Sequence, residues 1–266
     1  MSVAFVPAKT LDLAARARLF TASYEEYVVP FAVDEERLAF FERAFGTDLD
    51  RSLVATVGGE GVGLANLALD GKDGWVAGVG VVKPHRGTGL GRALMQELIE
   101  EARSAGVRRL WLEVIVENTR ARTLYERLGF EHVRLLDVWR LPGAPAETPL
   151  AALEDALAFV RAHRASREPW QRTDATVERL RALEPPPGGL VVEGGAAVVR
   201  VAGDAASLVQ LAATSEAGYD RLVAAARGLA ADVVLLNLPD DDPARAAVAR
   251  AAGEPAMRQH EMVLEL

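Results

Sequence analysis

The stretch VVKPHRGTGLGRALMQ, residues 81–96, joins an apolar run to a helical pattern through a loop with three glycines and two arginines. From Leu90 onward the apolar residues recur at helical spacing, and Gly106 is a suitable end for that helix. Glycines between a strand and a helix let backbone N–H groups approach an anion at the positive end of the helix. The stretch therefore predicts a phosphate-binding loop.

The spacing of the glycines narrows the kind of phosphate ligand. A dinucleotide-binding fingerprint would need a third glycine at position 92, where the chain has Arg92. A P-loop would need Gly-Lys-Ser/Thr, which the sequence lacks. The pattern that remains is Arg86-x-x-Gly89-x-Gly91.

In the segments around the loop, the apolar residues recur at spacings typical of helices and strands. We expect two helices first, over 11–28 and 34–45, with Asp34 as the N-cap of the second. A hairpin through GGEG and a strand over 74–82 lead into the loop. After the loop helix, a strand over 107–116, a short helix closed by Gly129-Phe130 and a strand over 131–141 complete the first half.

This order of elements, the Arg86-x-x-Gly89-x-Gly91 loop and the pattern N-x-x-A-x-x-L-Y-x-x-x-G-F at 118–130 resemble the GNAT N-acetyltransferase superfamily over residues 1–141. The resemblance implies a loop that cradles the pyrophosphate of acetyl-CoA, which we expect as co-substrate. The loop residues that it assigns to cofactor binding are Arg86, Gly87, Thr88, Gly89, Leu90 and Gly91.

The resemblance also implies that strand 74–82 diverges from the next strand, so that its backbone at Val79 and Val81 can bind pantetheine and the thioester. A backbone N–H near Val81 would polarise the thioester carbonyl. Gly78 and Gly80 suit such an opening, although they could equally serve a simple bend. Asn118 is expected either as an N-cap or as a contact of the pantetheine arm, or as both.

Tyr125 matches the tyrosine that protonates the departing thiolate in the family, and the competing interpretation is a core aromatic residue. The strand 74–82 contains no carboxylate, so the usual position of the general base is vacant. Glu113, inside an apolar strand, is the best candidate base, and a structural glutamate is the alternative. Glu25 and Glu26 fall in the acceptor-lining region of the family, where solvated surface glutamates are also common.

The second half of the sequence resembles a degenerate duplicate of the first half. We expect a fold of the α/β (α+β layered) class with two tandem GNAT-like domains, each a mixed, mostly antiparallel sheet flanked by helices. The boundaries are a catalytic domain at 1–141, a Pro-rich linker at 142–149 and a degenerate domain at 150–266. TSEAGYDRLVAAARG stands where the glycine loop should be, so the copy should lack the cofactor site; an unrelated α/β domain is the alternative.

Composition limits the partners. The chain has 266 residues and no cysteine, and its formal net charge of −8 is unlike a nucleic-acid-binding surface. No apolar run approaches the roughly 20 residues of a membrane span, and the first residues do not resemble a signal peptide. We expect a cytoplasmic enzyme with a small-molecule or peptide amine as acceptor, no nucleic-acid or membrane partner and no metal, and leave a homodimer open. Alternatives are a noncatalytic acyl-CoA sensor and a transferase of another acyl group.

Overall fold

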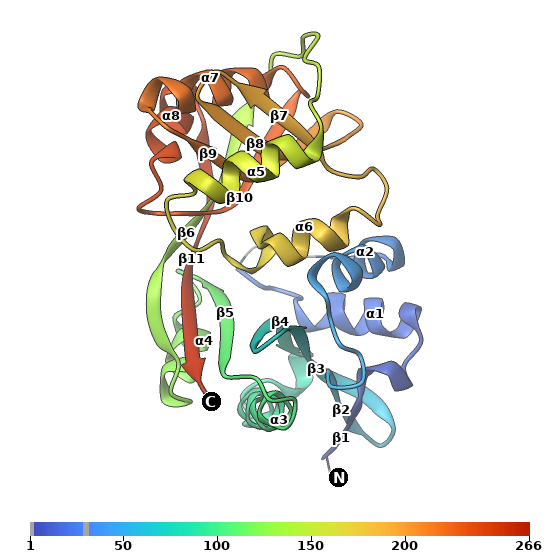
Figure 1. The fold of residues 1–266 in the computed structure, drawn as a ribbon. Helices are drawn as coiled ribbons and strands as arrows, with labels where there is room; N and C mark the ends of the chain where they lie inside the picture. Colours follow the sequence, from blue (N-terminus) through green and yellow to red (C-terminus); the bar gives the residue numbers. More distant parts are fainter. Residues whose placement is uncertain (1–2, 29–31) are drawn as a thin grey trace. The chain divides into compact units, whose positions relative to one another are not determined.

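The computed structural model describes residues 3–28 and 32–266. The chain divides into two compact units, which Figure 1 shows as ribbons: Met1–Val133 together with His260–Leu266, and Arg134–Gln259. None of the helices in the described ranges has the length and apolar character that crossing a bilayer requires. Residues 29–31, the end of the stretch SYEEYVVPF that follows the first predicted helix, lie outside the described residues.

The first unit contains a sheet with the strand order β1-β2-β3-β4-β5-β11. Its elements are β1 (Val3–Pro7), α1 (Leu13–Ser23), α2 (Glu35–Phe45), β2 (Leu53–Val57), β3 (Glu60–Asp70), β4 (Asp73–Val81), α3 (Leu90–Ser104), β5 (Arg109–Ile115), α4 (Thr119–Arg127) and the end of β11 (Glu254–Glu265). Each of the strands β1, β2 and β3 pairs antiparallel with the next strand in sequence, whereas β4 and β5 are parallel. The sheet is therefore mixed and mostly antiparallel, as expected.

Local signals in the sequence placed most of these elements. The Asp34 carboxylate accepts a hydrogen bond from the Arg37 amide at 2.8 Å, as predicted for an N-cap. Gly106 has a φ of 78° just after α3, which confirms the predicted helix end. The prediction that two helices come first was wrong, because β1 precedes them. α1 also ends at Ser23, before the predicted end of that helix, and Glu26 has a φ of 57° that a helix cannot contain.

The helices of the first unit pack on two faces of its sheet. On β2, Leu53 and Ala55 contact the core cluster that contains α3 and Tyr125, whereas Val54 contacts the cluster formed with α1 and α2. Because neighbouring residues of a strand point to opposite faces, α3 covers one face and α1 and α2 cover the other.

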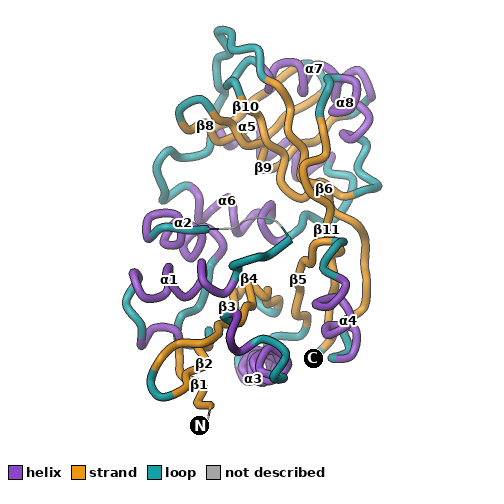
Figure 2. Tube along the Cα trace, turned by 180° about the vertical axis from the view of Figure 1, so that it is seen from behind, coloured by secondary structure: helices purple, strands orange, loops and turns teal. Residues whose placement is uncertain are grey.

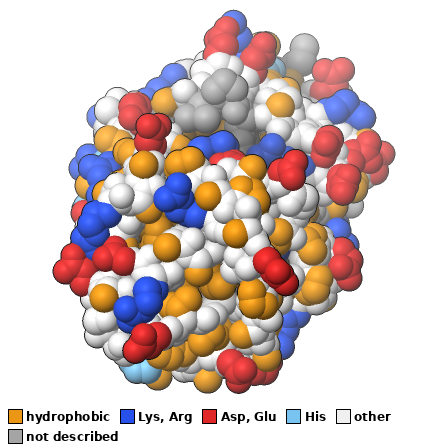
Figure 3. Space-filling view, turned by 90° about the horizontal axis from the view of Figure 1, so that it is seen from above, with side chains coloured by type: hydrophobic (Ala, Val, Ile, Leu, Met, Phe, Trp, Pro, Cys, Tyr) orange, Lys and Arg blue, Asp and Glu red, His pale blue; other side chains and the backbone are white. Residues whose placement is uncertain are grey.

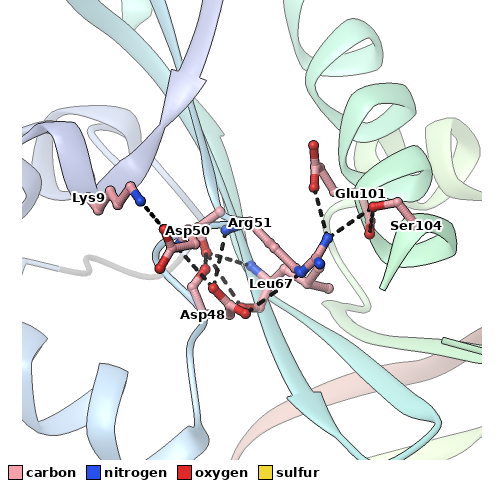
Figure 4. A network of polar contacts seen from close by, with 8 residues as sticks. Lys9, Asp48, Asp50, Arg51, Leu67, Glu101 and Ser104 are labelled. Carbon is pink, nitrogen blue, oxygen red and sulfur yellow. Dashed lines mark hydrogen bonds and ion pairs between the residues drawn. The ribbon is translucent and has the colours of Figure 1, made fainter. Parts of the chain in front are cut away.

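A polar network fixes the carboxyl end of α3 (Figure 4). The Asp48 carboxylate accepts hydrogen bonds from the amides of Asp50 at 2.9 Å and Arg51 at 3.2 Å. The Arg51 guanidinium donates to Ser104 Oγ at 3.0 Å and approaches Glu101 at 3.4 Å. The turn before β2 thereby holds the helix whose amino end follows the glycine loop.

The second unit repeats this order, and its strand order is β11-β6-β10-β9-β8-β7. Its elements are most of β6 (Glu131–Pro142), α5 (Leu153–His163), α6 (Asp174–Leu180), β7 (Gly188–Val192), β8 (Gly195–Ala202), β9 (Ala205–Ala213), α7 (Glu216–Arg227), β10 (Asp232–Pro239), α8 (Ala244–Arg250) and the beginning of β11. β9 and β10 are parallel, like β4 and β5, whereas β7 pairs antiparallel with β8, β8 with β9, and β10 with β6. The expected tandem arrangement is confirmed at the level of element order.

The two hairpins share an irregularity. A register shift in the β3–β4 pair leaves Ala77 without a partner on β3, and a shift in the β8–β9 pair leaves Val209 in the same situation on β8. Both bulges lie four residues after the first paired residue of their strand, Asp73 and Ala205. A common bulge position supports duplication over an unrelated second domain.

The last strands of the two halves are exchanged between the units. β6 follows α4 in sequence, yet its residues from Leu136 to Pro142 pair with β10 (Figure 2). Met262 of β11 is fully buried in the core of the first unit. The division between units therefore falls after Val133, inside β6, which differs from the expected boundary at 142–149.

The expected linker is also bound to the second unit. The amide of Gly143 donates to the Ala231 carbonyl at 2.8 Å, and the amide of Ala146 donates to the Gly228 carbonyl at 2.9 Å. The segment is therefore an ordered edge of that unit.

The surface in Figure 3 carries acidic and basic side chains, with apolar side chains exposed between them. On the face that Figure 3 shows, the charges are therefore of mixed sign.

Candidate active site

The parallel strands β4 and β5 form a fork. Their register joins Asp73 to Arg109, Gly74 to Leu110 and Trp75 to Trp111. In the described ranges no further pair follows, although β4 continues to Val81 beside β3. The predicted divergence of the two strands is confirmed.

The free edge of β4 presents backbone polar groups to this fork. The Val82 amide donates to the Val62 carbonyl at 3.0 Å, so the backbone of Val82 faces β3. Alternation along the strand turns the polar groups of Val81 and Val79 toward the fork. The two residues named from the sequence are therefore in a position to bind a ligand that enters it.

Gly78 and Gly80 of β4 are needed for different physical reasons. Gly78 follows the bulge and has a φ of 150°, which L side chains rarely adopt. At Gly80 a Cβ would lie 2.7 Å from the Cβ of Ser23, the last residue of α1. Gly78 thus shapes the strand, and Gly80 lets α1 approach it.

A cavity of about 670 Å³ opens at the fork, between the turn after α1, β4, the glycine loop and α4. The predicted site residues that line it are Val79, Val81, Arg86, Gly87, Gly89, Gly91, Asn118 and Tyr125. Thr88, Leu90 and Glu113 are not among the described residues of its wall. The structure therefore brings most of the predicted site into one cavity.

The glycine loop has the geometry of an anion site. Gly87 and Gly89 have φ values of 80° and 90°, and Gly89 is the N-cap of the 15-residue helix α3. A Cβ on Gly89 would meet nothing within 4 Å, so its backbone is open to a ligand. Thr88 stabilises the turn by donating to the His85 carbonyl at 2.8 Å, and Leu90 is buried in the core. The first amides of α3, which lack partners within the helix, point at this open space.

The side chain of Arg86 faces away from the loop. Its guanidinium donates to the carbonyls of Val81 at 2.9 Å, Glu25 at 2.7 Å and Ser23 at 3.2 Å. These contacts tie β4 to the turn after α1. What Arg86 offers an anion is therefore its backbone, and its charge is engaged by carbonyl oxygens.

Other arginines bring positive charge to the cavity, and the sequence reasoning missed them. Arg92, Arg120 and Arg127 line it. The Nη2 atom of Arg120 lies 4.0 Å from the position of a Cβ on Gly87. The sequence could have indicated them, because Arg92 lies in the first turn of the helix after the glycine loop and the other two lie on α4.

Tyr125 is both a core residue and part of the cavity wall. It is 7% exposed, and its ring lies 6.0 Å from that of Phe130. Burial, with smaller contributions from Tyr24 and Tyr27, raises the pKa of its hydroxyl well above the usual range. The hydroxyl therefore keeps its proton at neutral pH and can donate it.

Asn118 is the N-cap of α4 and also lines the cavity. Its Oδ1 accepts a hydrogen bond from the Ala121 amide at 3.1 Å, which caps α4. Its Nδ2 donates to the Tyr27 hydroxyl at 3.2 Å inside the cavity. One side chain thus stabilises the helix and presents a donor to the fork.

Glu113 lies on the opposite face of the sheet from Tyr125. Leu112 and Val114 pack in the same cluster as Tyr125, so alternation along β5 turns Glu113 to the other face. Trp75, whose ring meets Phe45 of α2 at 5.8 Å, donates from Nε1 to Glu113 Oε2 at 2.5 Å. Glu113 is therefore half-buried beside the fork on the side of α1 and α2.

The glutamates after α1 separate two cavities. Glu25 and Glu26 line the fork cavity and a neighbouring cavity of about 900 Å³ next to α1 and the start of α2. Glu26 forms an exposed ion pair with Lys83 at 2.7 Å. Tyr24 also lines both cavities, a position that the sequence pattern of SYEEYVVPF does not indicate.

The equivalent place in the second unit is filled. One residue after the Val209 bulge stands Gln210, where the first unit has Gly78, and this buried side chain donates to the Arg172 carbonyl at 2.5 Å. Arg172 is 1% exposed and pairs with Glu168 at 2.9 Å. Four residues before Gly253 the chain has Ala249 in place of the tyrosine.

Comparison with known proteins agrees with this geometry. Residues 16–130 match the acetyltransferase (GNAT) family. A streptothricin acetyltransferase of Streptomyces lavendulae is 37% identical over 92 residues, which are 33% of this chain and 48% of that protein. The [ribosomal protein bS18]-alanine N-acetyltransferase of Escherichia coli (strain K12) is 51% identical over 47 residues, 18% of this chain and 32% of that protein. The chain thus spans half or less of the length of these curated relatives.

A solved structure covers both units. A tandem GNAT protein from the clavulanic acid biosynthesis pathway aligns with a TM-score of 0.65 at 17% identity, over 99% of this chain and 98% of that one. At this identity the likeness concerns the fold, and the fold is the tandem arrangement.

Proposed function

Because residues 16–130 belong to the acetyltransferase (GNAT) family, we propose that the first unit transfers an acetyl group from acetyl-CoA to the amine of an acceptor by direct attack. The observation that carries the proposal is the single cavity in which the open edge of β4, the glycine loop and Tyr125 meet.

The residues of this cavity fit acetyl-CoA, the substrate that supplies the acetyl group. The amides of the loop from Gly87 to Gly91 would hold the pyrophosphate at the amino end of α3, with Arg92 and Arg120 beside it. The backbone of Val79 and Val81 and the side-chain amide of Asn118 would hold the pantetheine arm.

The reaction forms a bond between the acceptor nitrogen and the acetyl carbon and breaks the carbon–sulfur bond of the thioester. The sulfur must gain a proton, and we assign its donor to Tyr125, whose buried hydroxyl remains protonated at neutral pH. The amine must lose a proton, since a lysine-like amine has a pKa of about 10.4. We assign this proton to Glu113, acting through water because its carboxylate is outside the cavity wall.

The position of the two groups supports these assignments. Tyr125 and Glu113 lie on opposite faces of the sheet, on either side of the fork. A thioester in the fork would have the proton donor toward α4 and the proton acceptor toward α1 and α2, where the second cavity lies. The acceptor would then enter from the α1 side, past Glu25 and Glu26, and the charge of Glu25 would favour a cationic amine.

The class of acceptor follows from the chemistry and from the names of the relatives. One relative is a streptothricin acetyltransferase and the other a ribosomal-protein alanine N-acetyltransferase. We therefore propose a small-molecule or peptide amine as acceptor for this chain.

A coenzyme A release assay on the full chain tests the proposal. The panel contains aminoglycosides, polyamines, amino acids and peptides, each with acetyl-, propionyl- and succinyl-CoA. Release that depends on both an amine and acetyl-CoA supports it. Binding of acetyl-CoA without release for any amine would favour the acyl-CoA sensor, and faster release from another thioester would favour a different acyl group.

A further inference from the structure

Two tyrosines of the turn after α1 lie across the fork. The ring of Tyr24 stacks on Phe20 with a centroid distance of 4.8 Å and meets Tyr27 edge-on at 5.1 Å. This aromatic row continues α1 into the fork cavity, which both tyrosines line. Its two hydroxyl groups reach opposite walls of that cavity.

On the β4 side, burial raises the pKa of the Tyr24 hydroxyl, and the backbone N–H of Val79 beside it lowers that pKa. The same oxygen lies 3.1 Å from the position of a Cβ on Gly78, so it sits directly against the free edge of β4. On the α4 side, the Tyr27 hydroxyl accepts from Asn118 Nδ2 at 3.2 Å.

These are two of the polar contacts that the proposed function assigns to the pantetheine arm. A backbone N–H has one hydrogen to donate, so a ligand carbonyl bound at Val79 would compete with the neighbouring Tyr24 hydroxyl for it. The aromatic rings also occupy part of the space that the arm would need. Ligand and tyrosines therefore compete.

We propose that Tyr24 and Tyr27 stand in for the pantetheine arm in the free enzyme, and that acyl-CoA displaces them toward the acceptor cavity. This inference rests on the proposed function. Tyr24 then becomes part of the acceptor wall, so the acceptor site is completed after the acyl donor has bound.

The backbone around the tyrosines allows such a movement of side chains. Arg86 holds the carbonyls of Ser23 and Glu25 on either side of Tyr24, which keeps the main chain in place. Tyr24 already lines both cavities, so a change of its rotamer transfers the ring from one to the other. The displacement thus needs rotation about side-chain bonds and no unfolding of α1.

Calorimetric titration of the full chain with coenzyme A, and separately with acetyl-CoA, tests the competition. The variants are Tyr24→Phe, Tyr27→Phe and the double substitution, which keep the ring packing and remove the competing acceptor oxygens. A hydrogen bond of ordinary strength predicts a Kd about two- to tenfold lower for each single variant, and a larger decrease for the double variant. Tyr219→Phe in the second unit is the matched control and should leave the Kd unchanged.

An unchanged or higher Kd in both single variants, with normal thermal unfolding, would overturn the inference, because the hydroxyls would then assist binding or take no part. The proposed function would still stand in that case, since the wild type binds. Absence of binding in the wild type and in all variants would overturn both. Binding by the double variant alone would support the inference in its strongest form.

Discussion

The indole nitrogen of Trp75 lies 2.5 Å from Oε2 of Glu113, where β4 and β5 begin to separate. Trp75 is the last residue of β4 that pairs with β5, and its partner there is Trp111. Glu113 lies two residues after Trp111 on β5. An indole N–H is a donor only, so it stabilises the charged form of the carboxylate. Trp75 therefore orients the proposed base at the fork.

Replacing Trp75 by Phe should make the reaction more sensitive to acid. Without the donor the charged carboxylate loses a hydrogen bond that stabilises it, so the base is less available in acid. We expect the acid limb of the profile of kcat/KM against pH to move upward by about one to two units, since hydrogen bonds to charged groups are worth about 1.5–3 kcal/mol and one pH unit corresponds to about 1.36 kcal/mol. The plateau at high pH should be retained.

Trp111→Phe is the control for that measurement. Trp111 stands on the same rung, and its Nε1 approaches Asp73 at 3.5 Å. The Trp111→Phe substitution should leave the acid limb of the pH profile in place. Equal displacement in both variants would attribute the effect to packing, and no displacement in Trp75→Phe would remove Glu113 from the proton path.

Replacing Tyr125 by Phe should separate catalysis from binding. The ring still fills its place beside Phe130, and only the proton donor is lost. We expect kcat to fall by about 10²- to 10⁴-fold, as is typical of a lost general acid, with the calorimetric Kd of acetyl-CoA unchanged. Turnover equal to that of the wild type would leave Tyr125 as a core residue alone.

Replacing Gly89 by Glu should abolish binding of acetyl-CoA. The side chain would bring a negative charge to the proposed pyrophosphate site, and Gly89 has no neighbour that it would displace. Gly203→Glu controls for the backbone, since Gly203 also has a positive φ of 58° and open space around it. We expect one binding site per chain in the Gly203 variant and none in the Gly89 variant. Two sites per chain in the Gly203 variant and one in the Gly89 variant would instead reveal a site in the second unit.

The sequence contained the local part of this site. The glycine loop, the N-cap Asp34 and the ending at Gly129-Phe130 depend on residues a few positions apart, so patterns predicted them. The position of Tyr27 depends on Asn118, which is 91 residues away in sequence. A window along the chain contains no trace of such a contact, and the two tyrosines were accordingly missed.

The exchange of strands escaped prediction for a related reason. EHVRLLDVWRL and EPAMRQHEMVLEL both have the composition of a closing strand, at equivalent places in the two halves. Each pattern predicts a strand, but neither pattern indicates which sheet that strand joins. Either assignment buries a similar set of apolar side chains, so the partner is decided only by the complete fold.

This exchange predicts that residues 1–145 do not form a stable domain by themselves. The fragment lacks Met262, which is 0% exposed in the core of the first unit, and Leu264 and Leu266, which pack against that core. It also loses the hydrogen bond from the Leu266 amide to the Arg108 carbonyl at 2.8 Å, and it retains β6 without its partner β10.

The loss is large enough to decide the outcome. Burying one side chain such as Met contributes about 1.5–3 kcal/mol, and a whole domain is stable by only about 5–15 kcal/mol. We expect the fragment to aggregate or to unfold at a markedly lower temperature than the full chain, as measured by calorimetry and circular dichroism. A synthetic peptide of residues 254–266 should raise its unfolding temperature and restore binding of acetyl-CoA. The same peptide with Met262→Asp should do neither, because a charge cannot replace the buried thioether. A fragment that is fully stable and fully active without any peptide would mean that the strand of the second half is dispensable to the first unit.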